Sequence, residues 1–78
     1  MDIKKIKNIV NFISNRYCYN FNLVIGYNCI IIKFTETKYS HLRADQYFEM
    51  IEEIIYDEYI INFKTKLSNS EIFIYNKS

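Results

Sequence analysis

The chain has 78 residues, half of them apolar, and a formal net charge of +1. This length predicts one domain over residues 1–78 with a small hydrophobic core. Eight Tyr and six Phe argue against a disordered chain. With one Gly, the chain cannot form a glycine-rich phosphate loop. Its net charge of +1 also differs from the strongly positive net charge that is typical of a dedicated nucleic-acid-binding domain.

Neither a secretory signal nor a membrane span is expected. The N-terminal MDIKKIKNIV lacks the apolar run of a signal peptide, and no window approaches about 18 consecutive apolar residues. We therefore expect a cytoplasmic protein in which Cys18 and Cys29 are reduced and belong to the core. The favoured residue types, Ile, Asn, Lys, Tyr and Phe, have AT-rich codons, which indicates an AT-rich organism, phage or mobile element.

Residues 3–17 predict the first helix. At about 100° per residue its main apolar residues occupy one arc of about 120°. They are Ile3, Ile6, Ile9, Val10, Ile13 and Tyr17. Asp2 suits the N-cap, because its carboxylate accepts from free backbone N–H groups. Phe12 is expected to point away from this arc.

Residues 19–35 predict a β-hairpin in which apolar and more polar residues alternate. The alternating apolar residues are Phe21, Leu23 and Ile25, then Ile30, Ile32 and Phe34. Gly26-Tyr27 suits a type II′ turn, whose first central residue needs a positive φ. This turn predicts that Leu23 faces Ile30, Phe21 faces Ile32 and Tyr19 faces Phe34.

A second helix is predicted to follow the connector 36–41, with Ser40 as its N-cap, and to end near Asp57. Its apolar arc holds Ala44, Tyr47, Phe48, Ile51, Ile54 and Ile55. The opposite face is acidic, with one tyrosine: Asp45, Glu49, Glu52, Glu53 and Tyr56, with Asp57 at its margin.

Two further strands are predicted. In residues 59–67, Ile61, Phe63 and Leu67 alternate with Asn62, Lys64 and Lys66; SNS marks a turn, and EIFIYN forms the last strand. The predicted fold is α+β, in the order α-β-β-α-β-β, with both helices on one face of a mainly antiparallel four-stranded sheet. The pattern does not determine the strand order. Four apolar residues are left to face away from the core and await a partner or a second copy: Phe12, Ile31, Phe73 and Tyr75.

The sequence shows no catalytic or metal signature. His41 is the only histidine, and no spacing joins it to Cys18 or Cys29, although such a pair could form in three dimensions. Two isolated cysteines and one histidine do not supply a structural zinc site, and helical Glu49 and Glu53 lack the loop arrangement of a calcium site. We therefore expect no enzymatic activity, catalytic residue, metal or cofactor.

The acidic face is the first candidate binding surface. No Lys or Arg lies between Asp45 and Glu58, so the i,i+4 pairs within this helix are pairs of like charge, which destabilise it. Acids near its C-terminal end also oppose the helix dipole. A solvated face is the simpler interpretation. The uncompensated charge nevertheless favours a surface for a cationic partner, either by imitating phosphates or by contacting Lys and Arg.

A second candidate surface is basic and suits phosphates: Lys4, Lys5, Lys7, Asn8, Asn11 and Arg16. Its four charges are few for a nucleic-acid-binding regulator, so we rank protein binding above direct nucleic-acid binding. These lysines also suit solubility, or pairing with the acidic helix of a second copy in a homodimer. A homo-oligomeric structural subunit is a further alternative.

In size, layout and the acids Asp45, Glu49, Glu52, Glu53 and Asp57, the chain resembles small phage-encoded anti-CRISPR inhibitors. These proteins share no common motif; many are non-enzymatic single domains with one acidic face. Many nucleic-acid mimics among them are strongly acidic overall, whereas this chain is near neutral, which favours a specific protein contact. The resemblance implies a viral protein, acting in the host cytoplasm, that blocks a defence complex or nuclease. Its partner would be a host protein or ribonucleoprotein with a basic surface.

Overall fold

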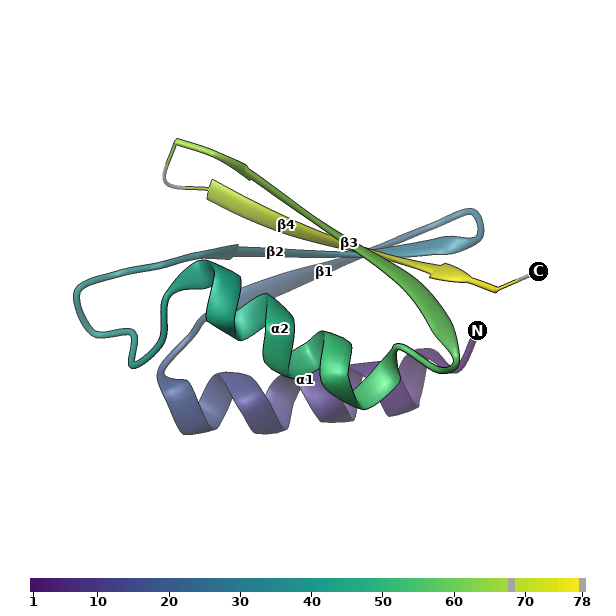
Figure 1. Cartoon of the computed structure of the whole chain (residues 1–78), viewed down its shortest axis with the longest axis horizontal. Helices are drawn as coiled ribbons and strands as arrows, with labels where there is room; N and C mark the ends of the chain where they lie inside the picture. The colour runs from purple at the N-terminus through teal and green to yellow at the C-terminus, as the bar shows by residue number, and fades with distance from the viewer. Residues whose placement is uncertain (68, 78) are drawn as a thin grey trace.

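Two helices cover one face of a four-stranded sheet, and no described element covers the other face (Figure 1). This computed structural model describes residues 1–67 and 69–77. The elements are α1 (Ile3–Tyr17), β1 (Phe21–Gly26), β2 (Cys29–Thr35), α2 (Ala44–Ile55), β3 (Tyr59–Lys66) and β4 (Asn69–Asn76). The α+β class and the order α-β-β-α-β-β are those that the sequence predicts.

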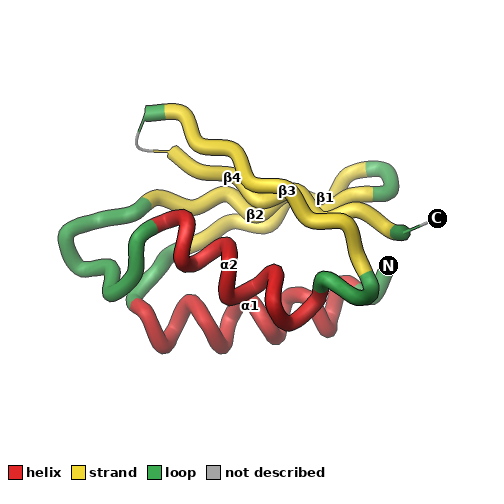
Figure 2. The backbone as a smooth tube through the Cα atoms, in the orientation of Figure 1, coloured by secondary structure: helices red, strands yellow, loops and turns green. Residues whose placement is uncertain are grey.

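The strand order is β1-β2-β4-β3, and every neighbouring pair is antiparallel. The last strand therefore lies inside the sheet, while β1 and β3 form its edges. The two helices lie next to each other (Figure 2). The colours of Figure 1, which run from the N-terminus to the C-terminus, show that the helices run in opposite directions. The N-terminal end of α1 is consequently close to the C-terminal end of α2.

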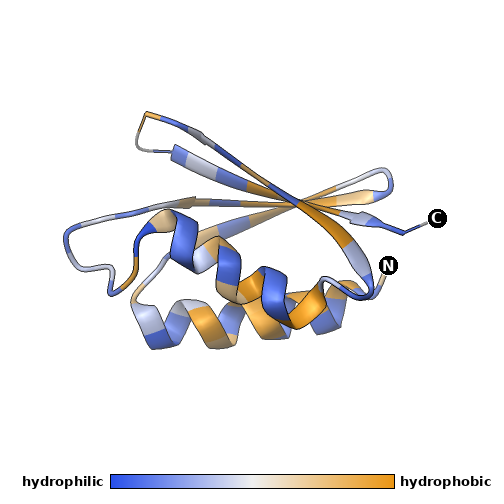
Figure 3. Cartoon of the chain, viewed as in Figure 1, coloured by the Kyte–Doolittle hydropathy of each residue, from blue (hydrophilic) through white to orange (hydrophobic). Residues whose placement is uncertain are grey.

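The core lies between the helices and the inner sheet face. Figure 3 shows the strands to be most apolar in the middle of the sheet. The buried side chains of the core come from both the helices and the sheet. They are Ile6, Val10, Ile13, Tyr19, Ile30, Ile32, Phe34, Tyr47, Ile51, Ile55, Tyr59, Ile72 and Ile74. Ser14 is also buried, and its hydroxyl is 2.5 Å from the hydroxyl of Tyr47. This contact joins the two helices and satisfies both polar groups.

The first hairpin differs from its predicted register by two residues. Leu23 faces Ile32, and Gly26 faces Cys29. The left-handed conformation falls on Asn28, with φ 60°, and not on Gly26. Asparagine tolerates this conformation better than most residues, so the turn moves by one residue. A slip of two keeps the same side chains on the core face, so the other predicted strand residues of the hairpin pack in or against the core, whereas Ile25, next to the turn, is 59% exposed.

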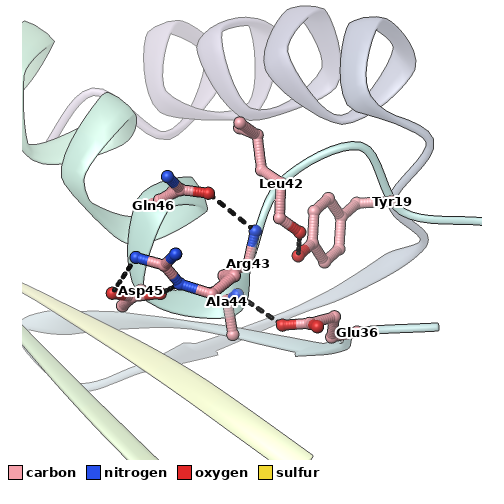
Figure 4. A network of polar contacts seen from close by, with 7 residues as sticks. All are labelled: Tyr19, Glu36, Leu42, Arg43, Ala44, Asp45 and Gln46. Atoms are coloured by element: carbon pink, nitrogen blue, oxygen red, sulfur yellow. Dashed lines mark hydrogen bonds and ion pairs between the residues drawn. The ribbon is translucent and has the colours of Figure 1, made fainter. Parts of the chain in front are cut away.

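The start of α2 also differs from the prediction. Ser40 is not its N-cap, because the Ser40 hydroxyl accepts from the backbone N–H of Thr37 at 3.0 Å. The first turn is satisfied by two other side chains (Figure 4). The N–H of Ala44 donates to Glu36 at 2.7 Å, and the N–H of Arg43, which precedes the helix, donates to Gln46 at 3.0 Å. Asp2, by contrast, caps α1 as predicted, since it accepts from the N–H of Lys5 at 3.0 Å.

Some apolar residues expected in the core lie at the surface. Leu67 is 94% exposed, because it follows β3 in a turn with φ 57°. Ile54 is 53% exposed on a flank of α2. The two cysteines also differ from the expectation: Cys18 is exposed after α1, and Cys29 is half-buried in β2. Phe12 points away from the core as predicted, being 68% exposed.

Candidate functional site

The acidic residues lie on α2 and on the turn that follows it. Glu49, Glu53, Tyr56 and Asp57 are exposed, and Glu52 is half-buried. The helix itself ends at Ile55. The N–H of Tyr56 still donates to the carbonyl of Glu52 at 2.8 Å, which keeps this tyrosine next to the acids. We call Glu49, Glu52, Glu53, Tyr56 and Asp57 the outer face of α2.

Asp45 does not contribute a free charge to this face. Its Oδ1 is 3.1 Å from Nε of Arg43, just before the helix (Figure 4). The hydrogen bond and charge of Arg43 lower the pKa of the Asp45 carboxyl, and Asp45 in turn raises the pKa of Arg43. Within residues 1–67 and 69–77, none of the four acids of the outer face forms an ion pair. The uncompensated charge thus starts at Glu49.

The basic residues of α1 do not form one surface. Lys5 is held by Glu58, with 2.6 Å between Nζ and Oε1, and this hydrogen bond raises the pKa of Lys5. At about 100° per residue, Lys5 and Arg16 lie on one flank of the helix and Lys7 on the other. Arg16 also lies about 16 Å farther along the axis than Lys5. Lys4, Asn8 and Asn11 complete the predicted set: the first two are exposed and the third is half-buried.

The fold does bring Cys18 and His41 together. The Cys18 sulfur is 3.7 Å from Nε2 and 3.9 Å from Nδ1 of His41, and both residues are exposed. The N–H of His41 donates to the carbonyl of Tyr17 at 2.9 Å, which holds the connector against the end of α1. A catalytic pair also needs a group that orients the base. No side chain in the described part of the chain donates to or accepts from the imidazole apart from Cys18. We therefore assign no reaction to this pair.

Metal-binding geometry is absent from the residues that the structure describes, because no three His, Cys, Asp or Glu side chains gather in a group able to hold an ion. Neither described helix is long and apolar enough to cross a membrane.

The uncovered sheet face carries residues that sequence reasoning did not bring together. Ile31, Phe73 and Tyr75 were expected to face away from the core, and the strand register places them there. The same register places Lys33 of β2 on the uncovered face. Lys64 and Lys66 of β3 also lie on this face, where Lys64 pairs with Glu71 and Lys66 with Asn69. Period-two alternation could have assigned each lysine to a face. Only the strand order places Lys33 and Lys64 on either side of Glu71.

Comparison with known proteins provides no relative: no family model matches the chain, and neither a curated protein nor a solved structure matches it.

Proposed function

We propose that this chain is a non-enzymatic binding protein whose outer face of α2 holds a basic surface of another protein. The supporting observation is that Glu49, Glu53 and Asp57 are exposed and form no ion pair among the described residues. Like-charged neighbours at helical spacing destabilise an isolated helix. A cationic partner would relieve this repulsion, and electrostatic complementarity would raise both the specificity and the rate of association.

Tyr56 adds a contact of another kind. Its ring is 55% exposed and lies beside the acids at the end of α2. Tyrosine is enriched in protein interfaces, since its ring gives apolar area and its hydroxyl a hydrogen bond, and arginine stacks well on such rings. A surface rich in arginine is therefore a better complement than one rich in lysine, because arginine also pairs with carboxylates in a bidentate manner.

The proposed consequence of binding is inhibition of a host defence complex or nuclease in the host cytoplasm. This target class follows from the resemblance to anti-CRISPR inhibitors. An enzyme that acts on nucleic acid contacts phosphates with Arg and Lys, which would complement the acids of α2. A blocking mechanism needs only occupancy of such a surface, without chemistry. Nucleic-acid binding through α1 is the weaker alternative, because Lys5 is paired with Glu58 and the remaining basic residues diverge.

The test is a capture experiment with charge-matched variants. Tagged wild type, the triple variant Glu49→Gln, Glu52→Gln, Glu53→Gln and the control Asn8→Lys, Asn15→Lys, Asn20→Lys are each incubated with nuclease-treated host lysate. Both variants change the net charge from +1 to +4, but the control changes exposed residues away from α2. Captured proteins are identified by mass spectrometry, and the target is then purified for affinity and inhibition assays.

We expect wild type and control to capture and inhibit the same enzyme, and the glutamine variant to bind it at least about tenfold more weakly. Equal binding by all three proteins would refute the role of the outer face of α2. Binding by wild type and control without inhibition would leave a binding protein and remove the inhibitor assignment.

A further inference from the structure

The uncovered face of the sheet is apolar in two adjoining rows and basic at one end. Because side chains of paired strands lie in rows across a sheet, the register gives the composition of each row. The mainly apolar rows are Gly26, Cys29, Tyr75 and Ile60, then Val24, Ile31, Phe73 and the polar Asn62. The next row toward the end of β2 is Asn22, Lys33, Glu71 and Lys64, followed by Thr35, Asn69 and Lys66. Both helices lie on the opposite face (Figures 1 and 2).

Two aromatic rings stand side by side on the central strand β4. The ring centroids of Phe73 and Tyr75 are 6.5 Å apart, and their planes differ by only 10°. Phe73 is half-buried and Tyr75 is 37% exposed. Parallel, partly exposed rings on a sheet offer a platform on which unpaired bases stack, and such stacking tolerates any base because every base has a π face.

Three lysines lie in the two rows next to Phe73, and one of them, Lys64, reaches the Phe73 ring. Nζ of Lys64 lies 5.2 Å from the centroid of the Phe73 ring, and Nζ of Lys33 lies 3.9 Å from Glu71. A hollow of about 970 Å³ lies at this end of the sheet. It is lined by Lys33, Lys64, Lys66 and Glu71 of the uncovered face and also by Phe21, Phe34 and Ser70 of the opposite face. Ammonium, amide and hydroxyl groups are the usual side-chain donors to phosphate oxygens.

Charge identifies the occupant. Three lysines and one glutamate give these rows a local charge of +2, whereas the free acids of α2 belong to the other layer. A second copy docked symmetrically would present the same patch and the same sign of charge. A polyanion with aromatic groups complements both features. We propose that the uncovered sheet face binds a single-stranded nucleic acid, with bases on Phe73 and Tyr75 and phosphates at Lys33, Lys64 and Lys66.

This proposal does not rest on the outer face of α2 and predicts a distinct salt dependence. Single strands release about 0.7 counterion per phosphate neutralised, so three lysines give a slope of about −2 in a plot of log affinity against log salt. Affinity should therefore fall about 20-fold between 50 and 200 mM salt. Loss of one stacking ring should weaken binding by about 5-fold to 150-fold.

The experiment measures fluorescence anisotropy of labelled 12-mer RNA, the same sequence as single-stranded DNA, and its duplex. The variants are Phe73→Leu, which keeps an apolar side chain without the ring, Glu71→Gln, and the triple variant Lys33→Gln, Lys64→Gln, Lys66→Gln. The charge-matched control is Lys4→Gln, Lys7→Gln, Lys38→Gln, which changes exposed lysines outside the sheet. Thermal unfolding establishes that each variant is folded.

We expect single strands to bind and the duplex to bind more weakly, with the relative affinity of RNA and DNA showing whether the sugar is read. Phe73→Leu and the sheet triple variant should weaken binding, and Glu71→Gln should tighten it about 2-fold to 5-fold by removing the only acid of these rows. Absence of binding at 50 mM salt, or equal loss in both triple variants, would overturn the proposal. So would a homodimer that Phe73→Lys dissociates, since the face would then be a protein interface.

Discussion

Replacing Glu53 with lysine tests whether the negative charge of α2 is uncompensated in the free protein. Glu53 is exposed, lies in the last turn of α2, and follows Glu49 at i,i+4 spacing. Removing the repulsion contributes about 0.2–0.5 kcal/mol, and the new attraction between Glu49 and the introduced ammonium group contributes a similar amount. A cation in place of an anion near the helix C-terminus adds about 0.3–1 kcal/mol. The free energy of unfolding should rise by about 1–2 kcal/mol.

Thermal and urea unfolding, followed by circular dichroism, measure this change. For a domain of this size, about 1 kcal/mol raises the melting temperature by about 4–8 °C. The gain should shrink in 1 M salt, where the Debye length is about 3 Å. Glu53→Gln is the matched control, because it removes the charge without reversing it, and about half the gain is expected.

An unchanged or lower stability of Glu53→Lys would refute this reasoning. Such a result would arise if positive charge on α1 offset the acids of α2. The helices run in opposite directions, so the N-terminal end of α1, with Lys5, lies near the end of α2. Compensation from α1 would mean that the outer face of α2 carries no electrostatic penalty. The charge row would then no longer favour a partner over a solvated face.

Four further outcomes follow from particular residues. Tyr47→Phe should lower the free energy of unfolding in urea by about 1–3 kcal/mol, because it leaves the buried Ser14 hydroxyl without its partner, and adding Ser14→Ala should restore part of the loss. Burial raises the pKa of Tyr47 to about 12, so the folded state favours the neutral phenol. The contribution of this phenol to the free energy of unfolding should be complete below about pH 10 and be lost as the pH rises through about 12. Tyr47→Phe should reduce this loss of stability at high pH. Cys18→Gly should raise the melting temperature by several degrees, corresponding to about 1 kcal/mol, since Cys18 has φ 61° after α1, whereas Cys18→Ala should give no gain. Asn28→Val should destabilise the hairpin by about 1–2 kcal/mol and Gly26→Ala by less, because of these two positions only 28 has a positive φ.

Local periodicity was sufficient to predict the elements. The 3.6-residue repeat of α1 and the two-residue repeat of the strands depend on which side of each element is buried, and this information is present within a few neighbouring residues. Asp2 likewise caps a helix that begins directly after it. Although the predicted hairpin register was wrong, each residue of the hairpin strands lies on the predicted face of the sheet, because a slip of two residues does not change that face.

Strand order and turn position depend on energies that no short segment contains. β2 pairs with β4 through Ile30 and Ile74 and through Ile31 and Phe73, partners more than forty residues apart in the sequence. The choice between Gly26 and Asn28 as the left-handed residue involves only about 1 kcal/mol, which cross-strand packing can exceed. Sequence alone therefore left the strand order open and misplaced the turn.

The candidate surfaces were predictable to different degrees for the same reason. Glu49 and Glu53 share one helix, so spacing alone placed them together. Arg43, two residues before Asp45, pairs with it at a spacing that is not helical, and its neutralising effect was missed. Lys33 and Lys64 lie on different strands, both next to β4, and only the tertiary pairing makes them neighbours of Phe73.

The net charge of +1 is therefore a poor guide to what this protein can bind. The free acids lie on the helix layer and the three sheet lysines on the uncovered sheet face, within a molecule whose Cα extents are 38 × 24 × 18 Å. At physiological salt the Debye length is about 8 Å, so each face presents its own sign of charge to a partner. If both proposals hold, the protein would bind an arginine-rich protein surface and a single strand of nucleic acid at the same time, and a nucleoprotein would supply both. Nuclease treatment separates the two contributions: capture through Glu49 and Glu53 should survive it, and any contribution of Phe73 should not.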